Sequence, residues 1–451
     1  MQSPRKMAAL VGVALALGMT GCGGDGDEPG AGGSSQTSGV DQGASDDATE
    51  LELWTFVDLH GKFYEEMANK WNQANPDKQV KIAVNVMPYD DMHNKLQLAL
   101  NSGEGVPDIV DIEVGRFANY IEGSPALEDL TSAAAPYAQD VVKARMDLYS
   151  KDGKLYGLPT HVGTTLAFYN TELLGAAGVD YTTIKTWDDF KAAGEAYHAA
   201  TGKCFGTADT AAQWQEALLM AQLGTDWMTP QGQLQVNNDR IVQAVSMLKD
   251  LQTANAICTI AGGQPDNEEA FGEYNAGNFA AAIMPEWFMS RYLSYLPDLS
   301  GKIAIAPPPA YPDSVHTTVG GGGTGTAVPS AGPNKALAAE YLAYAKLSLD
   351  GNIMIWDSLG FDPVNMAVWK DEAVTHNPDN DYVKYFQNNV FDVLNTLTEE
   401  IGYLPSTTMQ GMPNINNMFG TTTLNEIFEN DVDVKTALDQ AQADLKNELG
   451  Q

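Results

Sequence analysis

The chain of 451 residues carries 59 acidic and 25 basic side chains, which gives a formal net charge of −34. A surface this acidic repels phosphate backbones and anionic lipid head groups, so we expect no nucleic-acid partner, and an anionic ligand only in a locally basic pocket. An apolar fraction of 44% with 19% charged residues predicts a globular protein with a substantial core, either one large two-lobed body or two to three smaller domains.

The first 21 residues predict a secretory signal peptide. Arg5 and Lys6 form a positive head, and the apolar run that follows, from residue 8 to 18, is far shorter than the roughly 20 residues of a membrane-spanning helix. The next residues, Met-Thr-Gly-Cys22, resemble the bacterial lipobox, in which the cysteine is lipidated and begins the mature chain. An ordinary secretory signal with a chance cysteine is the alternative. We therefore expect the protein on the extracellular face of the cell membrane, anchored by lipid at Cys22.

Residues 22–50 contain almost no large apolar side chains and are rich in Gly, Ser and Asp. Such a composition predicts a flexible acidic linker, with a reach of about 30 Å at coil dimensions. No later stretch reaches 18 consecutive apolar residues, so the lipid is the only membrane attachment that the sequence predicts.

From residue 50 onward, strand and helix patterns alternate. In chain order they are a strand at 50–56, a helix with Phe63, Met67 and Trp71 on one face, a strand at 81–87, a helix at 92–100 and a strand at 107–112. This alternation predicts parallel βαβ units and therefore an α/β sheet. Thr186–Asp189 is a capping box that opens a later helix, and the chain from Asn334 onward is mostly helical.

The sequence contains no recognised catalytic or metal-binding motif. The six histidines are scattered without HExxH spacing, and both GxSxG and CxxC are absent. We therefore predict no metal and no cofactor. The glycine-dense run Gly320–Thr326 lacks the GK[ST] ending of a phosphate loop. We favour close backbone packing there over direct ligand contact, for which Gly322 is the candidate.

Two cysteines remain once Cys22 is lipidated. Cys204 and Cys258 would form a pair in an oxidising compartment, and a disulfide across this span would stabilise the fold by roughly 4 kcal/mol on the chain-entropy model. Two separate buried thiols are the other interpretation, because the sequence does not place the two residues within reach of each other.

Loops that mix aromatic and polar side chains are candidate sugar sites. Flat rings stack on the apolar faces of sugar rings, while Asp, Glu, Asn, Gln, Arg and His take the hydroxyls. The loops are Trp54 with Asp58 and His60, Glu113 with Arg116, Asp209 with Gln213 and Trp214, and Glu286 with Trp287. For each of them, a core aromatic ring or a solvated carboxylate is the alternative.

The order of several segments carries a family resemblance. The most specific are Gly153–Pro159, Leu166–Leu174, Lys185–Phe190, Gly277–Trp287 and Thr318–Val328. With them, residues 50–451 resemble the extracellular sugar-binding proteins of ABC importers, the group that contains maltose-binding protein. Trp54–Phe56, Tyr89–Lys95 and Lys151–Gly157 are most similar to binding proteins for arabinose-containing oligosaccharides.

The resemblance implies an α/β, two-lobed periplasmic-binding-protein-like fold with a hinge between the lobes. Lobe 1 would comprise 51–160 plus about 309–357, lobe 2 would comprise 161–308 plus about 358–451, and the crossovers would lie near 159–164, 303–308 and 357–363. Ligand would bind in the cleft between the lobes, and closing the hinge needs no chemistry.

The resemblance implies ligand contacts at Asp58, Arg116, His161, Asp209, Trp214 and Trp287. Together with the candidates from the mixed loops and the glycine run, the expected ligand contacts are Asp58, His60, Glu113, Arg116, His161, Asp209, Gln213, Trp214, Glu286, Trp287 and Gly322. His161 is included because Gly163 stands where maltose-binding protein has a glutamate. Ala211 replaces a stacking aromatic residue, which argues against a long maltodextrin ligand.

The implied function is that of a lipid-anchored, extracellular substrate-binding component of an ABC importer. We expect it to be a monomer without enzymatic activity that captures neutral oligosaccharides and delivers them to the permease subunits of the importer. A lipid anchor suits a Gram-positive cell, which has no outer membrane to retain a diffusing receptor. The alternatives are a secreted lipoprotein glycoside hydrolase, which needs two carboxylates at a fixed spacing, and a surface adhesin.

Overall fold

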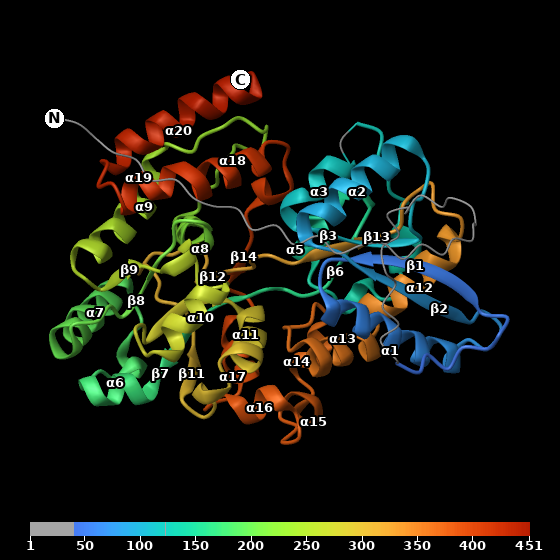
Figure 1. Ribbon diagram of the computed structural model, residues 1–451, viewed down its shortest axis with the longest axis horizontal. Coiled ribbons are helices and arrows are strands. Elements are labelled where there is room, and N and C mark those ends of the chain that lie inside the picture. Colours follow the sequence, from blue (N-terminus) through green and yellow to red (C-terminus); the bar gives the residue numbers. More distant parts are fainter. Residues whose placement is uncertain (1–39, 122) are drawn as a thin grey trace, which may run out of the picture. The chain divides into compact units, whose positions relative to one another are not determined.

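The computed structural model describes residues 40–121 and 123–451 (Figure 1). The predicted signal peptide, Cys22 and the linker up to residue 39 lie outside these residues. The described chain forms two α/β lobes, as the sequence predicts, and three crossovers join them.

The first lobe is built on a five-stranded sheet in the order β2-β1-β3-β13-β6. Its strands are β1 (Thr49–Thr55), β2 (Val80–Val86), β3 (Ile109–Glu113), β6 (Leu158–Pro159) and β13 (Thr324–Ala327). Its helices are α1 (Asp58–Ala74), α2 (Tyr89–Ser102), α3 (Val114–Ile121), α4 (Thr131–Ala134), α5 (Lys143–Asp147), α12 (Lys335–Leu347) and α13 (Leu349–Met354), and β4 (Ser150–Lys151) pairs with β5 (Lys154–Leu155). The strands β1, β2 and β3 are parallel, which confirms the βαβ prediction for this lobe.

Helix α1 shows why this lobe folds as the pattern predicts. Phe63, Met67 and Trp71 recur every four residues and are all buried. The helix packs against β2 and against α12, which begins more than 260 residues after α1 ends (Figure 1). The apolar face of α1 thus helps to bring the two segments of the lobe together.

The second lobe has a different sheet. Its central strand β7 (Thr165–Asn170) is antiparallel to both neighbours, β10 (Ala281–Pro285) and β11 (Ile303–Ala306). The parallel pattern predicted for the chain therefore describes the first lobe and the small pair β8 (Gly206–Ala208) and β9 (Ile257–Thr259). The larger helices are α6 (Thr171–Ala177), α7 (Trp187–Thr201), α8 (Trp214–Leu223), α9 (Asp239–Thr253), α10 (Glu268–Asn275), α11 (Met289–Tyr295) and α20 (Val434–Leu449).

The remaining elements follow the last crossover or lie beside it. They are β12 (Thr318–Val319), α14 (Met366–Trp369), α15 (Glu372–Thr375), α16 (Asp381–Tyr385), α17 (Val390–Leu397), β14 (Ile401–Gly402), α18 (Met412–Met418) and α19 (Leu424–Phe428). Of these, α16 packs against α11 and α17 against β11 in the second lobe, whereas α14 contacts both α17 and α13 of the first lobe.

Helix α7 begins at the predicted capping box. The Thr186 hydroxyl accepts a hydrogen bond from the Asp189 backbone N–H at 3.1 Å, and the Asp189 carboxylate accepts one from the Thr186 N–H at 2.9 Å. In the same lobe, Cys204 and Cys258 are joined as a disulfide, with their Cα atoms 5.9 Å apart. Since Cys258 lies on β9 and Cys204 lies two residues before β8, the bond ties the two neighbouring strands together.

Three crossovers connect the lobes. The first runs from β6 to β7, the second is the run Gly320–Gly323 between β12 and β13, and the third passes through Asp362. They hydrogen-bond to one another: the Val162 N–H donates to the Asp362 carbonyl at 3.0 Å, and the Gly321 N–H donates to the Gly163 carbonyl at 2.8 Å.

The second crossover lies later in the chain than the predicted 303–308. Strand β11 occupies that position within the sheet of the second lobe. The residues after it also stay with this lobe, because the amide of Gln222 on α8 donates to the carbonyls of Pro309 and Thr317 at 2.9 and 3.0 Å. The first lobe resumes only after Gly323, not at residue 309.

The predicted linker also ends earlier than residue 50. The side-chain amide of Gln42 donates to the Ile82 carbonyl at 3.0 Å, its oxygen accepts from the Ile82 N–H at 2.7 Å, and its own carbonyl accepts from Asn72 at 2.9 Å. Because β2 is an edge strand, Gln42 satisfies backbone groups there that have no neighbouring strand. Polar composition alone did not reveal this docking.

Candidate functional site

A cleft of about 740 Å³ is lined by residues of both lobes and by the crossovers. The first lobe contributes Phe56, His60, Tyr89, Glu113, Arg145 and Leu148; the second contributes Gln213, Trp214, Trp227, Gln264, Asp266, Trp287, Arg291, Tyr403, Met412 and Asn416; the crossovers contribute His161, Gly320–Gly323 and Phe361. This volume is typical of small-molecule sites, which combine apolar walls with a few placed polar groups.

Aromatic rings and histidines alternate on the first-lobe side. The ring of Phe361 lies edge-on to His60, with centroids 6.0 Å apart, and 4.8 Å from the ring of His161. Phe56, just after β1, lies 5.1 Å from Tyr89 at the start of α2, again edge-on. The ring of Phe361 therefore lies between the two histidines.

His161 is buried, and neither of its ring nitrogens has a hydrogen-bond partner among the residues that the structure describes. Burial and the nearby charge of Arg145 hold the pKa of His161 well below its usual range, so the ring is neutral. A neutral imidazole presents one N–H donor and one acceptor. His161 can thus serve the two roles that a sugar hydroxyl requires.

Glu113 lies at the end of β3, where its carboxylate accepts hydrogen bonds from the Gly115 N–H at 2.7 Å and the Tyr89 hydroxyl at 3.3 Å. Burial raises the pKa of Glu113 to about 7, in spite of these hydrogen bonds. Arg116, one turn further along α3, does not line the cleft. Its guanidinium donates to Asp90 at 2.6 Å and lies 5.1 Å from the ring of Tyr89, so it supports the wall from behind.

Two tryptophans form the opposite wall. The rings of Trp214 and Trp287 are 5.4 Å apart and nearly perpendicular. Trp287 is only 8% exposed, because Arg291 lies 5.3 Å from its ring and its indole N–H donates to the Gly321 carbonyl at 3.1 Å. Arg291 is fixed in turn by Asp266, at 2.7 and 3.3 Å. Trp214 is half-buried and offers the more open ring.

The glycine run packs its backbone closely against cleft residues and also lines the cleft. Gly322 has a φ of 68°, and a Cβ there would lie 3.1 Å from the indole nitrogen of Trp287. A Cβ on Gly323 would lie 2.9 Å from Nη2 of Arg145 and 3.5 Å from Nε2 of His161. The absence of side chains lets this backbone approach the cleft residues closely while lining the cleft itself.

Seven of the predicted contact residues come together at the cleft: His60, Glu113, His161, Gln213, Trp214, Trp287 and Gly322. Asp58, Arg116, Asp209 and Glu286 do not line it. Asp58 is exposed and pairs with Lys62 at 2.8 Å. Asp209 is buried beside Thr207, whose hydroxyl donates to it at 2.9 Å, and burial raises its pKa to about 7.

Glu286 is fully buried at the hinge instead. Its carboxylate accepts the Asp362 backbone N–H at 2.9 Å, and Asp362 in turn accepts the N–H groups of Gly163 and Thr164 at 2.7 and 2.9 Å. Burial and the neighbouring Asp362 raise the pKa of Glu286 well above its usual range. Glu286 therefore ties the end of β10 to the crossovers.

Several cleft residues were missed from the sequence, chiefly Phe56, Tyr89, Arg145, Gln264, Asp266, Arg291 and Phe361. Phe56 and Tyr89 stand inside segments that carried the resemblance, which was the one usable signal. Arg145 is 3% exposed; its Nε donates to the His161 carbonyl at 3.2 Å and its Nη2 to the Gly322 carbonyl at 2.7 Å. Its position depends on crossovers that are far apart in the sequence.

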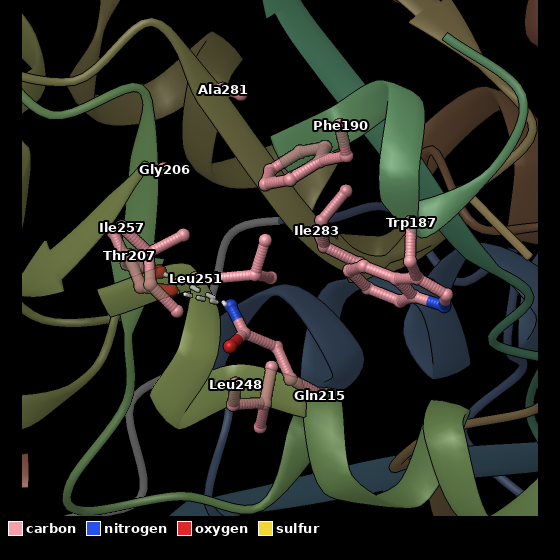
Figure 2. A pocket seen from close by; sticks show the side chains of 10 residues that line it. All are labelled: Trp187, Phe190, Gly206, Thr207, Gln215, Leu248, Leu251, Ile257, Ala281 and Ile283. Atoms are coloured by element: carbon pink, nitrogen blue, oxygen red, sulfur yellow. Dashed lines mark hydrogen bonds between the residues drawn. The ribbon is translucent and has the colours of Figure 1, made fainter. Parts of the chain in front are cut away.

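A second cavity lies within the core of the second lobe (Figure 2). Its volume is about 10 Å³, enough for about one water molecule. The amide of Gln215 points toward Thr207 and donates to its carbonyl at 2.9 Å, while the other lining side chains are apolar. This cavity has no room for an organic ligand.

Within 40–121 and 123–451, no group of three His, Cys, Asp or Glu side chains is arranged to hold a metal ion. Over the same stretch of chain, none of the helices combines the length and the apolar character needed to cross a membrane.

The chain belongs to the family of bacterial extracellular solute-binding proteins, whose family model matches residues 58–347. This confirms the resemblance drawn from the sequence. The chain is 40% identical to an arabinooligosaccharide-binding protein of Bacillus subtilis over 402 residues, which cover 88% of this chain and 92% of that protein. It is 37% identical to an arabinooligosaccharide-binding protein of Halalkalibacterium halodurans over 406 residues, 90% of each chain.

Solved structures show the same fold. The ABC-transporter-associated binding protein of B. animalis subsp. lactis Bl-04, in complex with beta-1,6-galactobiose, matches with a TM-score of 0.72 at 21% identity, over 89% of this chain and 98% of that one. The sugar-binding protein MalE of Xanthomonas citri matches with a TM-score of 0.74 at 16% identity, over 89% and 98% of the two chains.

Proposed function

We propose that this protein is the extracellular substrate-binding component of an ABC importer and that it captures neutral oligosaccharides, arabino-oligosaccharides first among them. The observation that carries the proposal is the cleft of about 740 Å³, with the Trp214–Trp287 pair on one wall and neutral or hydrogen-bonded polar groups on the other. The names of the relatives at 40% and 37% identity support arabino-oligosaccharides over other sugars.

Each wall would perform one part of the binding. The open ring of Trp214 would stack on the apolar face of a sugar ring, with Trp287 behind it. His161 and Glu113 would hydrogen-bond the hydroxyls from the other side. Contacts to both lobes favour the closed conformation, so binding alone supplies the free energy of closure. A neutral sugar is also compatible with the net charge of −34.

The proposal includes lipid anchoring at Cys22 on the outer face of a Gram-positive cell membrane, a monomeric body and delivery of the sugar to separate permease subunits. The lipobox-like residues before Cys22 support the anchor. Expression in a Gram-positive host tests it: the native chain should fractionate with membranes, with a mass that shows a diacylated N-terminal cysteine, whereas a Cys22→Ala variant should not carry the lipid. Native protein without the modification would refute the anchor.

The ligand is tested by calorimetric titration of the secreted body with arabinotriose, beta-1,6-galactobiose, lactose and maltotriose, together with thermal melts. Arabinotriose should bind tightest and raise the melting temperature most, because a ligand of the folded state stabilises it. Preference for another sugar would refute the proposed ligand class. Release of arabinose on prolonged incubation would instead support the glycoside hydrolase alternative.

A further inference from the structure

Beneath the first-lobe wall lies a carboxylate that the proposed binding site does not use directly. Asp111, on β3, is completely buried. One carboxylate oxygen accepts hydrogen bonds from the hydroxyls of Tyr64 and Thr326, at 3.0 and 2.7 Å. The other accepts from the Thr55 hydroxyl at 2.8 Å and meets Nδ1 of His60 at 3.2 Å.

The charge state of Asp111 decides which nitrogen of His60 carries a proton. Burial alone would raise the pKa of Asp111, but the hydrogen bond from His60, the charge that His60 carries when protonated and the nearby charge of Lys346 hold it well below its usual range. The group is therefore a carboxylate, which only accepts hydrogen bonds. Nδ1 of His60 must then be the donor, and in the neutral ring Nε2 keeps the lone pair.

The ring of His60 has little freedom to turn away from this arrangement. It is 7% exposed, with Phe361 edge-on at 6.0 Å and Phe56 at 6.4 Å. His60 nevertheless lines the cleft. With Nδ1 directed at Asp111, the opposite side of the ring, which carries Nε2, is the part available to a ligand.

A buried carboxylate is a costly way to hold a fold together. Well-packed apolar residues in place of a buried charged pair are often as stable or more stable. Here the charge is placed behind a histidine of the ligand cleft, which gives it a use that packing alone does not require.

We propose that Asp111 is a positioning residue for sugar binding: it fixes the Nδ1–H tautomer of His60, so that Nε2 accepts a hydrogen bond from a sugar hydroxyl in the cleft. The inference rests on the proposed function, since it assigns one contact within the same site. It predicts that the ligand must present a hydroxyl donor at this position.

Two substitutions at His60 separate this role from a structural one. The amide of Gln reaches the position of Nε2, whereas the amide of Asn reaches that of Nδ1. If Nε2 binds the sugar, His60→Gln should keep the affinity for arabinotriose within about threefold and His60→Asn should lose about tenfold, the size of one hydrogen bond. If His60 only anchors Asp111, the order reverses and the proposal is overturned.

The tautomer itself can be read in the wild-type protein by ¹⁵N NMR of the imidazole rings. His60 should show a protonated Nδ1 and a bare Nε2, and only Nε2 should shift strongly when arabinotriose is added. His376, which is exposed and contacts Asp392, serves as the reference. A protonated Nε2 in the neutral ring, or an Nε2 signal that does not respond to bound sugar, would refute the assignment.

Asp111→Asn completes the test. Removing the charge should release the tautomer and weaken arabinotriose binding about tenfold, as expected when an orienting carboxylate is lost. Unchanged affinity with an unchanged tautomer would overturn the proposal. Should this variant fail to fold, the two His60 variants and the wild-type spectrum still decide. If the wild type itself does not bind arabinotriose, the proposed ligand is wrong, which is a separate outcome.

Discussion

The two walls of the cleft offer different kinds of interaction. The second-lobe wall offers ring surface: Trp214 lies against Trp287, and Arg291 covers part of the ring behind. The first-lobe wall offers polar atoms whose directions are set from beneath, such as those of His60 and Glu113. Ring stacking tolerates many sugars, while directed hydrogen bonds discriminate among hydroxyl arrangements. We therefore expect the second lobe to supply most of the affinity for a sugar and the first lobe most of the selectivity.

The largest effect should come from Trp287→Ala. Because this side chain is 8% exposed and hydrogen-bonded, its loss leaves a cavity and should lower the free energy of unfolding by about 3 kcal/mol or more. Sugar binding should weaken as well, since Trp214 loses its support. Chemical denaturation and calorimetric titration measure the two effects. Trp287→Phe, which keeps a ring, is the control, and an unchanged unfolding midpoint in the Ala variant would contradict the supporting role.

Trp214→Ala should separate binding from stability. This ring is half-buried, so the melting temperature should change little, while the affinity for arabinotriose should fall by about 2 kcal/mol, or roughly thirtyfold. Titration of this variant and of Trp214→Phe measures the stacking contribution directly. If Trp287→Phe loses more affinity than Trp214→Ala, the two tryptophans have the opposite roles.

Some residues of the cleft could be predicted from the sequence, and others could not. Trp287 was predicted because it ends a segment that carries the family resemblance, and Trp214 because it stands beside Gln213 in a loop that mixes aromatic and polar side chains. Asp58 and His60 looked equivalent in the sequence, but α1 begins at Asp58, so Asp58 faces Lys62 one turn on while His60 turns toward β3. The sequence does not fix the first residue of α1, so it cannot show which of these two side chains faces the cleft.

Residues held by distant parts of the chain were out of reach of sequence analysis. Arg145 acquires its role from the carbonyls of His161 and Gly322, and Phe361 from the third crossover. The second crossover, expected near 303–308 from the resemblance, coincides instead with β11, which pairs with β7 inside the second lobe. The antiparallel pairing of β7 likewise depends on neighbours more than 100 residues away.

Gly323→Ala should disturb the region where the two walls meet. The residue has a φ of 106°, and the added Cβ would lie 2.9 Å from Nη2 of Arg145, so we expect a loss of about 1–2 kcal/mol in unfolding free energy. Thermal melts measure it. Gly175→Ala is a matched control, because Gly175 lies in α6 with open space around its Cβ position and should tolerate the change or gain stability. Equal behaviour of the two variants would contradict the close approach of Gly323.

The smallest effect should be the pH dependence contributed by Glu113. Its pKa in the folded protein is raised to about 7, from an ordinary value of 4.5, so the folded state binds the proton more tightly than the unfolded state. Stability from this group is therefore full below about pH 4.5 and is lost as the pH rises to 7. Glu113→Gln removes the titration, so the variant should gain stability relative to the wild type between pH 5 and pH 8, by about 1 kcal/mol or less for a half-buried group. Melting curves at both pH values measure the difference.

The matched control, Glu104→Gln at an exposed position, should show no such difference. If the stability difference between Glu113→Gln and the wild type is the same at both pH values, the first-lobe wall does not desolvate this carboxylate. The two walls would then not differ in how they treat charge.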